Sequence, residues 1–220
     1  MNTEKRFPFA AAIAIAIFLS AGQRARAAGV PLHDGLISYW SLNENFGSIA
    51  HDTAPGGTVI DNGQVRNAPT WIDGIFGAGL QFDGTNQDVL LPSSADMNVG
   101  TAAVTLSAWV KLDVLPANQS GSFVGIFDST ADNYVLYLDK SANELRFKVT
   151  TAGGVAERPG VPADLLNTTN WLHVMGVYDG SRARMYFNGN QVDSHTAAGL
   201  SGLVRAGQVG GLGSQPADTG

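Results

Sequence analysis

The sequence predicts an all-β fold, a sandwich or a barrel, formed by one domain behind an N-terminal leader. Three observations lead to this class. Apolar residues alternate with polar ones at a period of two, no segment after the leader has a helical apolar repeat, and Gly, Asn and Asp separate the apolar runs at intervals of roughly ten residues. Hydrophobic residues make up 44% of the 220-residue chain and charged residues 15%, which is sufficient for a folded core.

The first 27 residues have the three parts of a secretory signal peptide. A short basic start precedes an apolar run over 7–21, and the tripeptide Ala-Arg-Ala at 25–27 is a small-residue cleavage site. Because the run is short for a membrane span, we expect cleavage after Ala27, a mature domain over 28–220 and no membrane span after cleavage. An uncleaved N-terminal anchor is the alternative.

The predicted mature chain is acidic. Four of the 13 basic residues and one of the 19 acidic residues lie in the leader, so the mature chain has a formal charge of −9. Such a charge repels nucleic acid, which we exclude as a partner. The chain has no cysteine, and a cysteine-free exported protein is more typical of a bacterium than of a eukaryote. We therefore expect a secreted or cell-surface protein of bacterial origin.

Predicted strands follow one another along the mature chain. The clearest covers 104–113, where every even position is apolar and every odd position is polar except for Trp109. Segments 144–149 and 182–187 alternate in the same way, which predicts half-buried strands. Further apolar runs between turn residues predict strands at 36–42, 79–82, 88–92, 122–127, 134–139, 171–178, 191–195 and 207–211.

Short polar turns divide the segment from Trp171 to His195. Asn188-Gly189 is the preferred pair for a two-residue turn with positive φ at both central positions. Asp179-Gly180 predicts a slightly longer turn of the same kind, as does Asp83-Gly84 further upstream. The segment is therefore expected to form three consecutive antiparallel strands.

Five sequence segments carry a family resemblance. In order they read GLISYWSLNENFGSIAHD, GIFGAGLQFDGTNQDVLLP, VTLSAWVKLD, WLHVMGVYDGSRARMYFNGNQV and QVGGLG, and they cover about residues 35–213. This order resembles the laminin-G-like jelly-roll domains of the concanavalin A-like lectin/glucanase superfamily. The resemblance implies a sandwich of two curved antiparallel sheets, often with a calcium ion, that recognises carbohydrate or protein. It does not identify a ligand, since the superfold hosts lectins, hydrolases, lyases and adhesion modules.

Two segments depart from the family pattern. In the loop HDTAPGGTVIDNG only Asp52 matches the loop that follows the first strand in the family. The sequence also ends at GLGSQPADTG, without the final strand of such domains, which pairs beside the first strand. The resemblance therefore implies a fragment or truncated product with an exposed sheet edge.

The residues for sugar-cleaving chemistry are not in a recognisable pattern. The mature chain has three glutamates, Glu44, Glu144 and Glu157, and no Glu-x-Asp-x-x-Glu or Glu-x-Asp-x-Glu run that would place paired acids on one strand face. A lyase would need a base such as His173 with a cation nearby, but no triad or metal-ligand spacing accompanies this histidine. A structural role for His173 is favoured, and a hydrolase or lyase remains the alternative function.

The candidate ligand-binding residues are Trp109, Arg182, Arg184 and Tyr186. Trp109 lies alone on the polar face of its predicted strand, where an indole can stack on a sugar ring, although cross-strand packing under a loop would also explain it. The other three share the polar face of one predicted strand. They would form a basic patch for acidic glycans if the strand at 144–149 lay beside them, and a solvated sheet face otherwise.

The candidate metal is calcium, which binds carboxylate and carbonyl oxygens on loops. Asp52 is the match to the family's loop ligand, and Asp34 or Asp83 could assist it, although turn-forming aspartates are an equal interpretation. Zinc is unsupported without cysteines or clustered histidines. The sequence therefore predicts an exported, non-catalytic jelly-roll module that binds a glycan or a cell-surface protein, with a purely structural adhesion domain as a further alternative.

Overall fold

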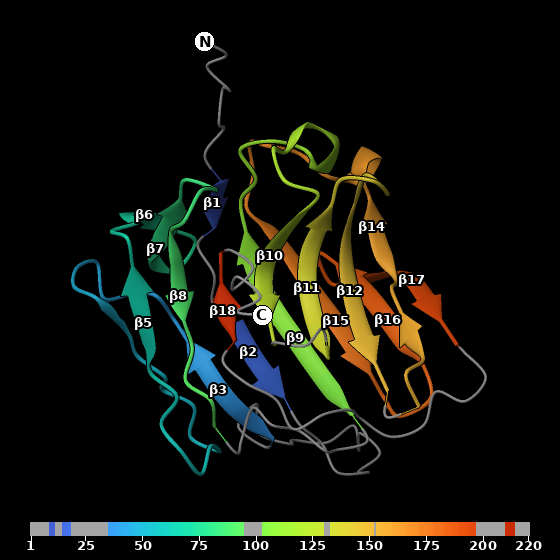
Figure 1. The fold of residues 1–220 in the computed structure, drawn as a ribbon, viewed down its shortest axis with the longest axis horizontal. Helices are drawn as coiled ribbons and strands as arrows, with labels where there is room; N and C mark the ends of the chain where they lie inside the picture. The colour runs from blue at the N-terminus through green and yellow to red at the C-terminus, as the bar shows by residue number, and fades with distance from the viewer. Residues whose placement is uncertain are drawn as a thin grey trace.

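The computed structural model of the 220-residue chain describes residues 9–11, 15–18, 35–94, 103–129, 133–151, 153–196 and 210–213. These residues form strands and two short 3-10 helices, η1 (Pro116–Asn118) and η2 (Ala163–Leu165), which confirms the all-β class. Within this described part, no helix is long and apolar enough to cross a membrane. Figure 1 shows the larger strands in two layers, with β10 to β12 in front of β9, β15, β16 and β17.

The front layer is a nine-stranded antiparallel sheet. Its strands run in the order β13 (Ala156–Glu157), β12 (Glu144–Thr150), β11 (Tyr134–Asp139), β10 (Phe123–Asp128), β18 (Gly211–Leu212), β8 (Asp88–Leu90), β5 (Gly63–Arg66) and β4 (Ile49–Ala50), and β14 (Gly160–Pro162) also pairs with β12. All six residues of β11 are buried, so both of its faces are covered.

The rear layer is a six-stranded antiparallel sheet. Its order is β17 (Asn190–His195), β16 (Ala183–Phe187), β15 (Leu172–Tyr178), β9 (Val104–Val110), β2 (Ile15–Phe18) and β3 (Leu36–Trp40). A smaller three-stranded sheet consists of β1 (Phe9–Ala11), β7 (Gly77–Phe82) and β6 (Thr70–Gly74). A turn at Ile75 and Phe76 joins β6 to β7.

The core lies between the two large sheets. Every second residue of β9, β12 and β15 is buried, as the period-two pattern predicts for strands with one dry face. The two layers approach most closely where Gly176 of β15 faces the ring of Phe147 of β12. The sandwich is thus held by apolar side chains that interdigitate from both layers.

The predicted three-strand meander is confirmed. β15 pairs with β16, and β16 pairs with β17, all antiparallel. The turn between the last two strands has positive φ at Asn188 (48°) and Gly189 (83°), which is the conformation for which Asn-Gly is preferred. Gly180 and Gly84 also have positive φ, in the two turns predicted from Asp-Gly pairs.

Most predicted strands are present with shifted ends, but several strands were not predicted. The segment 134–139 matches β11 fully, whereas the strand predicted at 104–113 ends at Val110. Short or polar strands such as β5 and β6 were missed. The strand predicted at 207–211 lies mostly outside the described residues, and only its end coincides with β18.

Two strands lie within the predicted leader. Ile15 of β2 pairs with Trp40 of β3, and Ile17 pairs with Leu106 of β9, so β2 fills the place between those two strands. The structure is that of the chain before any processing, and leader cleavage after Ala27 stays a prediction. In the full chain, a segment of the leader completes the six-stranded sheet (Figure 1).

Candidate binding site

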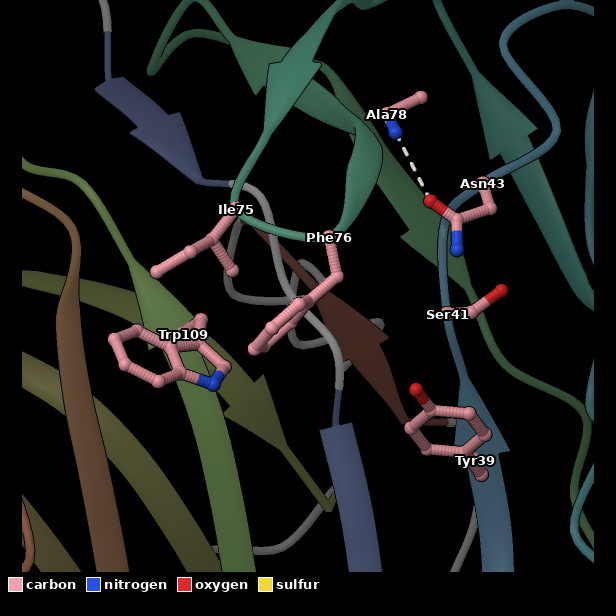
Figure 2. A pocket seen from close by; sticks show the side chains of 7 residues that line it. All are labelled: Tyr39, Ser41, Asn43, Ile75, Phe76, Ala78 and Trp109. Carbon is pink, nitrogen blue, oxygen red and sulfur yellow. Dashed lines mark hydrogen bonds between the residues drawn. The ribbon is translucent and has the colours of Figure 1, made fainter.

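A small hollow lies on the outer face of the six-stranded sheet, at its β9–β2–β3 end. The hollow is open to solvent. It is lined by side chains from β3, the loop after β3, the β6–β7 turn and β9, namely Tyr39, Ser41, Asn43, Ile75, Phe76, Ala78 and Trp109 (Figure 2). We call this feature the aromatic hollow.

The register of β2 sets the width of the aromatic hollow. Ala16 pairs with Tyr39 on one side and with Ser107 on the other. Trp109 lies two residues beyond Ser107 on the same face of β9, since side chains of a strand alternate between faces. Tyr39 and Trp109 therefore stand on opposite sides of β2, with the hollow between them (Figure 2).

The β6–β7 turn forms the upper wall. Phe76 is 68% exposed and its ring lies across from the indole of Trp109, with centroids 6.0 Å apart and planes at 81°. The backbone amide of Ala78 donates a 2.9 Å hydrogen bond to Asn43 Oδ1, which ties the turn to the loop after β3. Gly77 follows Phe76 with a φ of 100°, a conformation in which residues with a side chain would be strained.

Trp109 is supported from the side by β15. His173 is its cross-strand partner, with ring centroids 5.1 Å apart, and the Nε2 atom of His173 lies 2.9 Å from the Ser107 hydroxyl. Burial lowers the pKa of His173, so the imidazole is neutral at pH 7. No carboxylate among the described residues bonds the other ring nitrogen, and the pair is not a Ser-His-Asp triad.

Polar groups occupy the β3 side of the aromatic hollow. The Tyr39 hydroxyl and the Asn43 amide nitrogen face the space opposite the two rings (Figure 2). Within the described part of the chain, no hydrogen bond occupies either of these groups or the Ser41 hydroxyl. The site therefore combines aromatic faces with hydrogen-bonding groups, and none of the lining residues that the structure describes has a carboxyl group.

Trp109, Arg184 and Tyr186 lie on one face of the six-stranded sheet, but not in one site. Tyr186 pairs with Met175, which pairs with Ser107, so Tyr186 is two strands away from β9. Arg182 lies outside β16, is exposed, and donates its backbone amide to Asp179. The structure thus places the arginines outside the aromatic hollow.

The condition for a basic patch beside the arginines is not met. Arg146 and Lys148 belong to β12 in the other sheet, and β12 is not a neighbour of β16 within one sheet. Arg184 is paired with Asp179 at 2.6 Å, and Arg146 is paired with Glu144 at 2.7 Å. Local carboxylates therefore offset both guanidinium charges.

The two described calcium candidates make local hydrogen bonds to backbone amides. Asp52 Oδ1 accepts backbone amides of Tyr39 and Ala54 at 2.8 and 2.9 Å, and Oδ2 accepts that of Asp61 at 3.2 Å. Asp83 closes its own turn by accepting the amide of Thr85 at 2.8 Å. Among the described residues, no three His, Asp or Glu side chains are grouped for a metal. Asp34 lies outside the described residues, and calcium binding stays a prediction.

Sequence reasoning found Trp109 but missed the rest of the aromatic hollow. Tyr39 and Phe76 are separated from Trp109 by many positions, and only the sheet order and the β6–β7 turn bring them together. One signal was available, because Ile75-Phe76 is an apolar pair between turn glycines at positions 74 and 77. Large apolar residues in a tight turn have no core to enter, and they are expected at the surface.

Comparison with known families gives one match that covers most of the chain. A family model described as the concanavalin A-like lectin/glucanases superfamily matches residues 83–218. No curated protein sequence matches the chain significantly.

Solved structures share the fold at low sequence identity. The binding domain of Paraclostridial Mosquitocidal Protein 1 has a TM-score of 0.58 at 11% identity, covering 92% of this chain and 44% of that one. The binding domain of botulinum neurotoxin DC in complex with SialylT has a TM-score of 0.55 at 13% identity, covering 79% and 42%. The same domain in complex with rat synaptotagmin II gives 0.53 at 15% identity, covering 79% and 43%. At such identities the likeness shows the fold alone, and this chain spans less than half of each matched structure.

Proposed function

The chain belongs to the concanavalin A-like lectin/glucanases superfamily, and from this premise we propose that it is an exported, non-catalytic module that binds carbohydrate. The observation that carries the proposal is the aromatic hollow, where the rings of Trp109 and Phe76 face unoccupied hydroxyl and amide groups. Sugar rings have an apolar face and a rim of hydroxyls. A site with stacking surface on one side and hydrogen-bonding groups on the other complements both.

The fold neighbours agree with a binding role in general terms. They are binding domains, and one of them is in complex with SialylT. Another is in complex with rat synaptotagmin II, so a cell-surface protein is the second class of partner that the fold can accommodate. We favour the glycan, because the hollow is small and concave, whereas a stable protein interface needs about 800 Å² per partner.

The composition of the hollow argues for binding rather than cleavage. Glycosidases place two carboxyl groups on either side of the scissile bond. None of the described residues that line the aromatic hollow has a carboxyl group, and His173 has its Nε2 atom engaged by Ser107. A bound sugar would therefore meet stacking and hydrogen-bonding groups, but no acid pair.

Glycan-array binding with three matched variants tests the proposal. We expect wild type to bind, and both Trp109→Ala and Phe76→Ala to weaken binding by about tenfold or more, equivalent to about 1.4 kcal/mol. Phe76→Ala keeps the test valid if the tryptophan variant folds poorly, because Phe76 is mostly exposed in its turn. Tyr186→Ala removes an aromatic ring from the same sheet face outside the hollow and should bind as wild type does.

The array results separate the alternatives. Wild type that binds no glycan would contradict the proposal and favour a structural adhesion domain. Loss of binding in Tyr186→Ala, with binding by Phe76→Ala unaffected, would indicate that the site lies on the β15–β16–β17 meander and not at the hollow. Release of reducing ends from a bound polysaccharide would identify an enzyme.

Export is the second part of the proposed role, and it is supported by the leader pattern of residues 1–27. The test is the intact mass of the protein recovered outside the cytoplasm of an expressing bacterium. A mass that starts at Ala28 is expected. A full-length mass in the membrane fraction would support the uncleaved anchor instead.

A further inference from the structure

We propose that the aromatic hollow takes an uncharged pyranose ring, and that it discriminates against sialic and uronic acid residues. This inference rests on the proposed carbohydrate function and narrows the class of its ligand. It is carried by the chemistry of the described lining residues, the places of the nearest titratable groups and the spacing of Tyr39 and Trp109 across β2.

The described residues that line the hollow are all uncharged. Apolar or aromatic side chains form the walls at Ile75, Phe76 and Trp109, and residues with hydroxyl or amide groups form the β3 side at Tyr39, Ser41 and Asn43. A cation strengthens the recognition of a carboxylate in a partly desolvated site, because a buried charge without a partner of opposite charge is costly. Hydroxyl groups of a neutral sugar need donors and acceptors, which tyrosine and serine hydroxyls both supply.

The polar side chains on the β3 side also have hydrogen-bonding atoms that are available to a ligand. Asn43 uses its Oδ1 atom to accept the amide of Ala78, which fixes the orientation of the side chain and leaves the Nδ2 donors toward the space (Figure 2). The contact of Tyr39 with Asp52 involves only the backbone amide of Tyr39, so its hydroxyl is not occupied by that bond. The hollow thus presents the Asn43 donor and the Tyr39 hydroxyl to a ligand (Figure 2).

Three basic side chains are the candidates for binding an anion at the hollow. His173 contacts Trp109 from the side away from β3, and burial lowers its pKa, so that it has no charge at neutral pH. Arg184 is two strands from β9 and is paired with Asp179. Lys111 is closer, two positions after Trp109 on the polar side of its segment, but it is not among the lining residues.

The net negative charge of the protein also disfavours acidic glycans. The chain has 19 acidic and 13 basic residues, and its formal charge at pH 7 is −6. A negative protein surface lowers the local concentration of anionic ligands. An acidic glycan would therefore approach against the field and find no cation in the hollow, whereas a neutral glycan is unaffected by either factor.

The spacing of Tyr39 and Trp109 limits the ligand to about one ring. Tyr39 and Trp109 are separated by β2, so the gap corresponds to two strand spacings of about 4.8 Å. A terminal residue or one internal residue of a chain fits this description better than an extended chain does.

Binding to a two-class panel of soluble oligosaccharides, measured by calorimetry with the full chain, tests the inference. The neutral probes are cellobiose, maltose, lactose and di-N-acetylchitobiose, and the acidic probes are 3′-sialyllactose and digalacturonate. At least one neutral probe should bind, with no more than about a twofold change between 50 and 500 mM NaCl, because screening acts only on charged partners. Phe76→Ala and Trp109→Ala should weaken that binding about tenfold or more.

Lys111→Gln decides between the two ligand classes. If the ligand is neutral, this variant binds it within about twofold of wild type. An acidic probe that binds more tightly than every neutral probe, through Trp109 and with a loss in Lys111→Gln, would overturn the inference and leave the carbohydrate function standing. If no probe of either class binds and the glycan array is also negative, the carbohydrate function itself fails.

Discussion

Gly176→Ala is the variant that tests the packing of the two sheets most directly. Gly176 is in the middle of β15, where its Cα pairs with Leu106 of β9 and with Met185 of β16. A Cβ atom at this position would lie 2.6 Å from the Cβ of Phe147 and within 3.0 Å of its ring. Real Cβ atoms do not approach other carbons this closely, so one of the two sheets has to move.

The size of the effect follows from the lack of free space. Phe147 is 0% exposed and is surrounded by the core of both layers, so its ring has no alternative position. Adding one methyl group to a closely packed core costs about 1–3 kcal/mol. For a domain of this size each kcal/mol lowers the melting temperature by about 2–4 °C, so we expect a decrease of about 2–12 °C.

Thermal unfolding of a double-mutant cycle is the measurement. Phe147→Leu alone destabilises by leaving a cavity, and the pair Gly176→Ala with Phe147→Leu should lose less than the two single losses added together, because the smaller side chain makes room for the methyl. Wild-type stability of Gly176→Ala, or strict additivity in the double variant, would refute the reasoning. In that case β15 and β12 would not face each other as described.

Four further predictions concern loops, pH and the N-terminal segment. Asp52→Asn should destabilise by about 1–3 kcal/mol, because its amide oxygen can still accept the amides of Tyr39 and Ala54 but the nitrogen that replaces Oδ2 cannot accept the amide of Asp61. A loss seen only with calcium and not with chelator would identify Asp52 as a metal ligand instead. Burial alone would raise the pKa of Asp179, but hydrogen bonds from Arg184, Ser181 and Arg182 lower it to about 2. Wild type should therefore lose stability as the pH falls from about 4 toward 2. Urea titrations of Asp179→Asn over the same pH range should show a smaller loss. Burial lowers the pKa of His173 below its value in the unfolded chain. The stability that the neutral imidazole contributes is therefore present above about pH 6.5 and is lost as the pH falls through the folded pKa. Between pH 7.5 and 5, the denaturant midpoint of His173→Gln should fall less than that of wild type, and equal falls would contradict this prediction. Deletion of residues 1–27 should lower the melting temperature relative to the full chain, since it leaves backbone groups of β3 and β9 unpaired; equal midpoints would mean that β2 contributes nothing to the sheet.

The sequence predicts those strands that have one dry face. In β9 and β15 a period-two pattern produces alternating burial, and the Asn188-Gly189 turn determines how the meander returns. Strands such as β5 and β6 were not predicted, because they are short and contain polar or turn-forming residues. Their conformation comes from pairing with neighbours that are distant in the sequence.

Site residues were harder to predict than strands for a related reason. A strand's own pattern shows which side chains share a face, but it does not show which sheet the strand joins. This is why Arg146 was expected beside Arg184, although β12 and β16 lie in different layers. Trp109 was found because it interrupts a polar face, whereas Tyr39 and Phe76 depend on the order of β3 and β9 and on the β6–β7 turn.

The N-terminal segment connects the fold to the proposed site. An apolar run without charges suits an export leader, and it equally suits a strand that is flanked on both sides, as β2 is between β3 and β9. The described residues that line the aromatic hollow come from outside this segment, but its presence holds Tyr39 and Trp109 two strand spacings apart, about 10 Å. Direct pairing of β3 with β9 would halve that separation and leave too little room for a sugar ring. If the proposed function holds, glycan affinity should therefore depend on a strand that fills the place between β3 and β9, and a chain that begins at Ala28 should bind sugar only if another extended segment takes that place.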